Sequence, residues 1–293
     1  MAVRQQRSQG LTAASAAGGD AVDLEKIELD CLLEAVYKRY GFDFREYAPA
    51  SLRRRVSRRL QLEGLSTISA LQERLLRDPG VMERLLLDLS INVTAMFRDP
   101  SFYGALREKV VPLLKTYPFT RIWVAGCSTG EEVYSLAILL DEEKIYDRTR
   151  LYATDINEGV LERARLGVFP LAKMQDYTRN YIAAGGKRAF ADYYTSAYDG
   201  AAFDRSLLRN VVFAQHNLAS DQSFNEFHMI VCRNVMIYFE RSLQERVFDL
   251  FDTSLLRLGI LALGQKESLR MSESAAKYEE LDAAERIYRK VKS

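Results

Sequence analysis

A short turn of small residues is the part of the sequence best suited to binding a ligand. Residues 126–130 (GCSTG) stand between an apolar run at 122–125 and a helical pattern over 131–141. Small residues let the backbone approach a ligand closely, and a helix N-terminus favours negative charge. Asp155 follows at the end of the next apolar run, where its carboxylate can accept hydrogen bonds from both hydroxyls of a ribose. These features predict a nucleoside-containing cofactor bound where two strands end.

The residues around the turn indicate which cofactor is bound. The turn lacks the G-x-G-x-x-G spacing of dinucleotide sites, and the sequence has no phosphate-binding loop of the form GxxxxGK[ST]. Glu131 and Glu132 come directly after the turn, where their carboxylates would repel phosphates but suit a sulfonium and an amino group. The sequence therefore predicts S-adenosylmethionine as the cofactor and S-adenosylhomocysteine as the product. The alternative is that the two glutamates only stabilise the helix dipole.

The composition limits the classes of function. The 293 residues carry a formal net charge of +1, which leaves no large positive excess for binding nucleic acid by bulk electrostatics. The three scattered cysteines and two histidines predict neither a disulfide framework nor a metal site. No run approaches the roughly 18 apolar residues that span a bilayer, and no signal peptide opens the chain. We therefore expect a cytoplasmic protein that binds no nucleic acid or metal and does not insert into a membrane.

Two kinds of pattern divide the chain. Residues 1–22 are rich in Ala, Gly, Ser and Gln, which predicts a disordered tail. Residues 23–91 predict a small all-α domain with helices over 23–40, 50–62, 67–78 and 81–89. Residues 92–293 predict an α/β domain, into which a Tyr-rich subdomain is inserted at about 170–209.

The α/β domain alternates strands with helices. Strands are predicted at 122–125, 151–154, 211–214 and 229–232, and helices at 131–141, 158–166 and 243–256. Residues 260–263 and 286–291 predict a closing pair of strands. This order favours the α/β fold class, with a mostly parallel sheet.

Six segments together carry a resemblance to a known family. They are residues 92–98 (NVTAMFR), 123–135 (WVAGCSTGEEVYS), 153–156 (ATDI), 216–218 (HNL), 232–239 (CRNVMIYF) and 264–267 (GQKE). On these segments the sequence resembles the chemotaxis receptor glutamate methyltransferases, the CheR family. The resemblance implies a Rossmann-like S-adenosylmethionine-dependent methyltransferase sheet preceded by a small all-α domain. It also implies an enzyme that methyl-esterifies glutamate side chains of a chemoreceptor or a similar signalling protein.

The resemblance also implies roles for the matching residues. Contacts to the cofactor are implied for Asn92, Thr94, Arg98, Glu132, Asp155, Asn217, Leu218, Arg233 and Asn234. Arg98, Arg233 and Tyr238 are implied to position the reacting groups, with no general base because a glutamate carboxylate is already ionised near neutral pH. Simpler alternatives are a helix cap for Thr94, a turn for Asn217, and packing against Phe239 for Tyr238.

A basic helix offers a docking surface for the acceptor. Residues 52–60 (LRRRVSRRL) hold five arginines and no acid. Leu52, Val56, Leu60 and Leu62 are predicted to face the core, which leaves Arg55, Arg58 and Arg59 on one solvent face. In the resembled family the matching helix docks an acidic helical region of the receptor. The alternative is a solvated basic face without a partner.

Some residues depart from the family pattern. The family's usual FFR reads Met96-Phe97-Arg98, no histidine stands in the 264–267 turn, and His228 occupies the place of an aspartate. Residues 176–209 match the family's receptor-binding β-subdomain poorly, so the acceptor can be a receptor without a peptide tether or another signalling protein. Two further alternatives are a methyltransferase for a small molecule or RNA, and a non-catalytic scaffold that binds S-adenosylmethionine.

Overall fold

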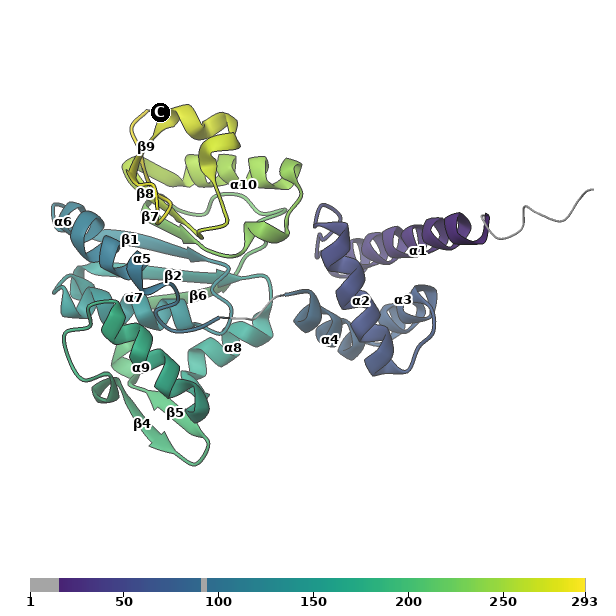
Figure 1. Cartoon of the computed structure of the whole chain (residues 1–293), viewed down its shortest axis with the longest axis horizontal. Coiled ribbons are helices and arrows are strands. Elements are labelled where there is room, and N and C mark those ends of the chain that lie inside the picture. The colour runs from purple at the N-terminus through teal and green to yellow at the C-terminus, as the bar shows by residue number, and fades with distance from the viewer. Residues whose placement is uncertain (1–15, 91–93, 293) are drawn as a thin grey trace, which may run out of the picture.

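The structure, a computed structural model, describes residues 16–90 and 94–292 and consists of a helical part and a larger sheet-containing part (Figure 1). The helical part contains α1 (Ala16–Tyr40), α2 (Pro49–Glu63), α3 (Ile68–Arg77) and α4 (Pro79–Leu89). Leu32, Val56, Leu71 and Leu85 come from these four helices and are fully buried together. Local signals end the helices as expected, because Gly64 closes α2 in the left-handed conformation and Thr67 caps α3.

The first helix is longer than the sequence pattern predicted. It begins at Ala16, so residues 16–22, which were predicted to belong to the tail, are helical. The three alanines of this stretch favour a helix intrinsically, whereas its two glycines do not, so helix propensity alone does not explain the early start. Leu24 and Ile27 of the predicted apolar stripe are exposed, and the buried face of α1 starts at Leu29. Residues 1–15 of the predicted tail lie outside the described residues.

The larger part is built on a seven-stranded sheet with the strand order β6-β2-β1-β7-β8-β10-β9. The strands are β1 (Thr120–Ala125), β2 (Thr149–Asp155), β6 (Val211–Gln215), β7 (Phe227–Cys232), β8 (Leu255–Leu263), β9 (Tyr278–Asp282) and β10 (Ile287–Lys290). Strands β6, β2, β1, β7 and β8 are parallel, and β10 runs antiparallel to both β8 and β9. The predicted fold class is confirmed, although the sequence analysis did not predict the edge strand β9.

Helices cover both faces of this sheet (Figure 1). They are α5 (Pro100–Ala105), α6 (Val111–Leu114), α7 (Glu131–Glu142), α8 (Glu158–Leu166) and α10 (Arg241–Ser254). Alternate residues of β1 serve the two faces: Ile122 and Val124 belong to the core with α5–α7, whereas Trp123 belongs to the core with α10. No sequence pattern predicted the helical segment at 100–114, where a π-helical turn at Leu106–Val110 joins α5 to α6.

The inserted segment forms a second, three-stranded antiparallel sheet. It contains β3 (Val168–Pro170), α9 (Met174–Ala183), β4 (Tyr194–Ala197) and β5 (Gly200–Phe203), with the strand order β3-β5-β4. The buried Glu142 carboxylate of α7 anchors it by accepting hydrogen bonds from Tyr193 Oη at 2.9 Å, Lys187 N at 3.0 Å and the Tyr181 hydroxyl. Arg107 pairs with the same carboxylate, so the insertion is fixed to the main sheet.

Two negative findings apply to residues 16–90 and 94–292. No helix in these ranges is both long and apolar enough to cross a membrane. The same residues contain no group of three or more His, Cys, Asp or Glu side chains placed to hold a metal ion.

Candidate functional site

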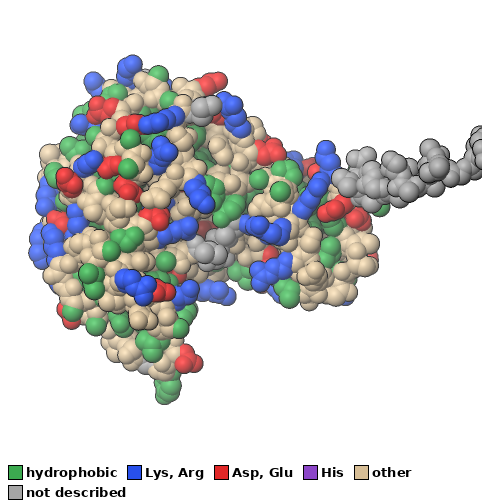
Figure 2. Space-filling view, in the orientation of Figure 1, with side chains coloured by type: hydrophobic (Ala, Val, Ile, Leu, Met, Phe, Trp, Pro, Cys, Tyr) green, Lys and Arg blue, Asp and Glu red, His purple; other side chains and the backbone are tan. Residues whose placement is uncertain are grey.

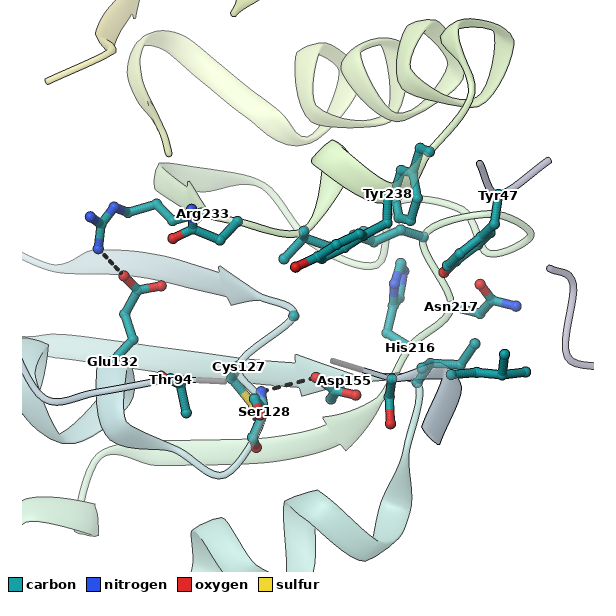
Figure 3. A pocket seen from close by; sticks show the side chains of 18 of the residues that line it. Tyr47, Thr94, Cys127, Ser128, Glu132, Asp155, His216, Asn217, Arg233 and Tyr238 are labelled. Atoms are coloured by element: carbon teal, nitrogen blue, oxygen red, sulfur yellow. Dashed lines mark hydrogen bonds and ion pairs between the residues drawn. The ribbon is translucent and has the colours of Figure 1, made fainter. Parts of the chain in front are cut away.

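A pocket lies at the carboxyl ends of the parallel strands, where open α/β sheets bind their ligands (Figure 3). Its volume is about 960 Å³ when the solvent-filled mouth is included. Most of the residues that the sequence predicted for the site line this pocket. They are Thr94, Arg98, Glu132, Asp155, Asn217, Leu218, Arg233, Asn234 and Tyr238. Asn92 lies outside the described residues. The fold thus brings together segments that are far apart in the sequence.

The turn after β1 needs its glycines. Gly126 and Gly130 have φ values of 74° and 96°, in the left-handed region. A Cβ atom at Gly126 would lie 2.5 Å from Val235 Cγ2, and one at Gly130 would lie 2.9 Å from Ala164 Cβ. The glycines therefore let the turn pack directly against the loop after β7 and against α8, while Cys127 and Ser128 line the pocket.

The Asp155 carboxylate at the end of β2 is held by the backbone on both of its oxygens. Oδ2 accepts a hydrogen bond from Ser128 N at 2.9 Å, and Oδ1 accepts one from Asn157 N at 3.1 Å. Burial raises the pKa of Asp155, and the backbone donors oppose that effect. Because a carboxylate oxygen can accept more than one hydrogen bond, both oxygens keep capacity for ribose hydroxyls.

A buried cluster of charged side chains lies at one end of the pocket (Figure 3). Arg233 Nη1 lies 2.8 Å from Glu132 Oε1, and its Nη2 lies 2.7 Å from Asp99 Oδ2. The same Nη2 donates to the Arg98 carbonyl at 3.2 Å, and the Arg233 guanidinium lies 4.0 Å from the Phe102 ring centroid. Burial lowers the pKa of Arg233, but Glu132, Tyr103 and Asp99 together outweigh this effect, so the pKa is raised. Arg233 is thus engaged on two sides and positions Glu132 and the 98–99 segment.

Glu267 is a positioning residue that the sequence analysis did not single out. Its Oε1 accepts from the backbone N–H groups of Val235 and Met236 at 2.9 and 2.8 Å. Its Oε2 accepts from those of Asn234 and Gly264 at 2.9 and 2.7 Å. These bonds hold Asn234 in the left-handed conformation, with a φ of 61°. The only sequence signal was the position of Glu267 in the matched 264–267 segment.

The helical part supplies one wall of the pocket, which the sequence analysis also missed. Phe44, Tyr47, Leu89 and Ser90 line the cavity although all four precede the linker at 91–93. A β-bridge joins Tyr47 to Phe239, and their rings are 4.7 Å apart. Phe239 therefore pairs with Tyr47, while Tyr238 lies under the Arg55 guanidinium at 5.0 Å. No periodicity or motif in the sequence could have revealed this contact between domains.

The prediction that Arg55, Arg58 and Arg59 share a solvent face is wrong. Arg59 is only 8% exposed because Asp88 of α4 and Glu63 pair with it. Arg55 is half-buried and donates to the Leu89 carbonyl. Arg58 is exposed, with 71% of its side chain accessible, and lies 3.8 Å from the Asp88 carboxylate.

The apolar side of α2 also differs from the prediction. Leu52 and Val56 are buried and Leu60 is half-buried, but Leu62 is 61% exposed. The helix therefore turns a narrower apolar face towards the core than the sequence pattern indicated. The packing of α4 against α2, which decides these environments, is not encoded in the local sequence.

The structure also places three further residues that the sequence singled out. Asn217 serves as a turn residue, since its Oδ1 accepts from Ala219 N at 3.0 Å, and it lines the pocket as well. Glu131 is buried with its carboxylate bonded to Thr129 Oγ1 at 2.6 Å, which matches the structural alternative for this residue. His228 Nδ1 accepts from Arg121 N at 3.1 Å, between β7 and β1.

Comparisons with known proteins match both parts of the chain. A family model described as "CheR methyltransferase, SAM binding domain" matches residues 92–285, and one described as "CheR methyltransferase, all-alpha domain" matches residues 27–90. The chain is 50% identical over 264 residues to a putative methyltransferase, Cher3, of Pseudomonas putida, covering 90% of this chain and 97% of that protein. It is 34% identical over 240 residues to chemotaxis protein methyltransferase 2 of Pseudomonas aeruginosa, covering 80% and 84% of the two chains.

The position of Asp155 generates a prediction about cofactor binding. Asp155→Asn keeps the shape of the side chain, removes the charge that would strengthen the bonds to the ribose hydroxyls, and replaces one acceptor oxygen with an NH₂ group that cannot accept. We expect the variant to bind S-adenosylhomocysteine more weakly by about 1.5–3 kcal/mol, the scale of hydrogen bonds to a charged group. Titration calorimetry measures this change, with Asp176→Asn on the exposed face of α9 as the matched control. Unchanged affinity in a folded Asp155→Asn protein would rule out the ribose contact.

Proposed function

The chain belongs to the CheR methyltransferase family, and from this premise we propose that it methyl-esterifies glutamate side chains of a chemoreceptor or a related signalling protein. It is an S-adenosylmethionine-dependent methyltransferase. The observation that carries the proposal is the single pocket that gathers the matched residues from the 94–98 segment and from the ends of β1, β2, β6 and β7.

The residues of the pocket fit the proposed cofactor. Glu132 lines the pocket beside Arg233, whose guanidinium pairs with it, so this end of the pocket offers a carboxylate. Such an end suits the amino group and the sulfonium of S-adenosylmethionine. Figure 3 shows Asp155 in the middle of the pocket, where its carboxylate can accept hydrogen bonds from the ribose hydroxyls.

The proposed reaction needs alignment more than acid–base chemistry. S-adenosylmethionine, when bound, supplies a methyl carbon activated by positively charged sulfur. A glutamate carboxylate, with a usual pKa of about 4.3, is already a nucleophile at neutral pH. The chain therefore has to hold the acceptor in line and exclude water, effects worth up to roughly 7–11 kcal/mol in favourable cases. Arg98, Asn234 and Tyr238 line the pocket and are the side chains we propose for this positioning.

The acceptor is proposed to dock on the exposed basic face of α2. This face, corrected by the structure, consists of Arg54 and Arg58. Figure 2 shows Lys and Arg side chains gathered on the helical part beside its junction with the larger part. Arg55 lies on the same helix and reaches Tyr238 at the pocket, so an acidic helix bound on α2 would lie close to the reaction site.

A labelling experiment tests the proposed bond. Membranes from cells that lack this enzyme are mixed with the purified chain and with S-adenosylmethionine carrying a tritiated methyl group. We expect a membrane-associated protein to gain tritium and to release it as volatile methanol in mild alkali, because a carboxyl methyl ester is hydrolysed there. A parallel reaction without the chain gives the background.

Two outcomes of this labelling would contradict the proposal. Label that stays on the protein after alkali would indicate a nitrogen acceptor. If no protein is labelled although the chain binds S-adenosylhomocysteine normally, the result would favour a different acceptor or the non-catalytic scaffold.

The docking face generates a separate prediction. The double variant Arg54→Glu/Arg58→Glu should transfer methyl groups to the protein acceptor at least about tenfold more slowly at low salt, because it reverses the charge that attracts an acidic partner. Added salt should slow the wild type in the same way, since the Debye length is about 10 Å at 0.1 M. The affinity of the double variant for S-adenosylhomocysteine should equal that of the wild type, because neither arginine lines the pocket.

A control with the same change of net charge makes this result specific. Lys38→Glu/Arg77→Glu alters two other exposed positions of the helical part, whose side chains are 72% and 79% accessible. This control should methylate the acceptor at nearly the wild-type rate. Equal rates for the two double variants at low salt would exclude a specific docking role for α2.

A further inference from the structure

A second cavity lies where the helical part meets the larger part. It opens between α4 and α8, which are neighbours across the junction in Figure 1, and we call it the junction groove. Its volume is about 1060 Å³ when the solvent-filled mouth is included. The junction groove shares no lining residue with the pocket that contains Asp155. It is therefore a separate cavity, with no role in the proposed function.

The helical part lines the junction groove mainly with apolar side chains. They are Tyr40, Phe42, Pro79, Met82, Leu86 and Leu87. Met82 and Leu86 are buried, whereas Tyr40, Phe42 and Leu87 keep part of their surface exposed. A ligand that removes this apolar surface from water gains stability from the hydrophobic effect. This wall of the groove therefore favours a ligand with apolar side chains.

The charges around the junction groove are mostly negative. Glu83 of α4 lines it, as do Glu158 and Glu162 of α8, and Arg163 is the one cation among the lining residues. These four residues are exposed. Glu158 pairs at 2.5 Å with Arg165, which does not line the groove. The groove therefore combines an apolar wall with an acidic rim.

Two of these acids lack a partner of opposite charge. Within residues 16–90 and 94–292, neither Glu83 nor Glu162 forms an ion pair. Arg84, the neighbour of Glu83, pairs instead with Glu63 at 2.8 Å. Because like charges that face one cavity from α4 and α8 repel each other, a positively charged ligand between them relieves the repulsion. Charge complementarity thus favours a cationic ligand.

Hydrogen bonds fix the walls of the junction groove. Asn157 Nδ2 donates to Ser90 Oγ at 3.0 Å, which joins the start of α8 to the end of α4. The Tyr40 hydroxyl donates to the Leu75 carbonyl at 2.6 Å, so the ring keeps one orientation. A preformed groove binds a ligand without the cost of ordering its own walls.

We propose that the junction groove binds a peptide segment of a protein partner that carries arginine or lysine beside large apolar side chains. The apolar side chains pack on Phe42 and Leu87, and the cations pair with Glu83 and Glu162. A small polycation satisfies the charges but leaves the apolar wall uncovered, so a peptide fits the groove better. This partner is basic, whereas the acceptor proposed for α2 is acidic, so the groove serves a second interaction.

The test uses a hexapeptide of sequence GRLFRG with a fluorescent label at its N-terminus and an amidated C-terminus. It is titrated by fluorescence anisotropy against the full chain at low salt. S-adenosylhomocysteine is present at saturation, so that the carboxylates of the other pocket are covered. We expect saturable binding to the wild type. The variant Glu83→Lys/Glu162→Lys should bind the peptide at least about tenfold more weakly, because it reverses the charge that attracts the peptide.

Matched controls separate the charge from the apolar contact. Glu73→Lys/Asp176→Lys makes the same change of net charge on α3 and α9, at side chains that are 70% and 62% accessible, and it should bind the peptide as the wild type does. The peptides GELFEG and GRAARG should each bind the wild type at least about tenfold more weakly than GRLFRG, because one reverses the charge and the other removes the apolar side chains. These two peptides test the proposal even if a groove variant does not fold.

The position of the bound peptide is checked by amide hydrogen exchange. We expect GRLFRG to slow exchange within residues 82–87 and 158–163 of the wild type, because these segments of α4 and α8 line the groove. Protection confined to other segments would contradict the proposed site.

The remaining contradictions identify other occupants. Absence of saturable binding, or equal affinity of the wild type and Glu83→Lys/Glu162→Lys, would overturn the proposal. Displacement of the peptide by spermidine at equal concentration would also overturn it and identify a small polycation as the ligand. Tighter binding of the peptide to a full chain with Arg4→Glu/Arg7→Glu would show that the chain's own residues 1–15, which carry these two arginines and no acid, occupy the groove in place of a partner.

Discussion

Most of the site depends on the hydrogen bonds that the buried Glu267 carboxylate accepts from the backbone. Four backbone N–H groups, those of Gly264, Asn234, Val235 and Met236, donate to it from a buried position. A buried carboxylate is costly unless its oxygens are saturated with donors, so the loop after β7 has one conformation that satisfies this charge. Burial raises the pKa of Glu267, and the four donors counteract that rise. The loop in turn directs Asn234 and Tyr238 into the pocket.

The junction between the two parts follows from the same loop. The Tyr238 carbonyl, at its end, accepts the hydrogen bond from Ala48 N, and Phe239 pairs with Tyr47. At its beginning, Arg233 pairs with Glu132 of α7 and with Asp99 beyond the linker. One segment of seven residues, 233–239, therefore contacts the helical part, Asp99 and α7. This connectivity explains how a pocket made from distant segments has a defined shape.

The sequence predicted the parts of this structure that local chemistry determines. The turn at 126–130 and Asp155 were placed correctly because small residues and a strand end leave few alternatives. The burial of Arg59 could not be predicted, because its partner Asp88 is distant in the sequence and lies on α4. Glu267 and Tyr47 escaped notice for the same reason, since each acts through backbone or ring contacts across the fold. The start of α1 at Ala16 has no local signal, because two glycines stand among the alanines of residues 16–22.

The most direct test of this account is amide hydrogen exchange of residues 234–236 in a Glu267→Gln variant. A glutamine has almost the same shape, but it carries no charge and replaces one acceptor oxygen with an NH₂ group that cannot accept. We predict that the variant folds and that these amides exchange at least about tenfold faster than in the wild type. The nearby Glu273→Gln variant, on an exposed side chain, should leave them unchanged. Exchange at the wild-type rate in Glu267→Gln would contradict the claim that this carboxylate fixes the loop that builds the site.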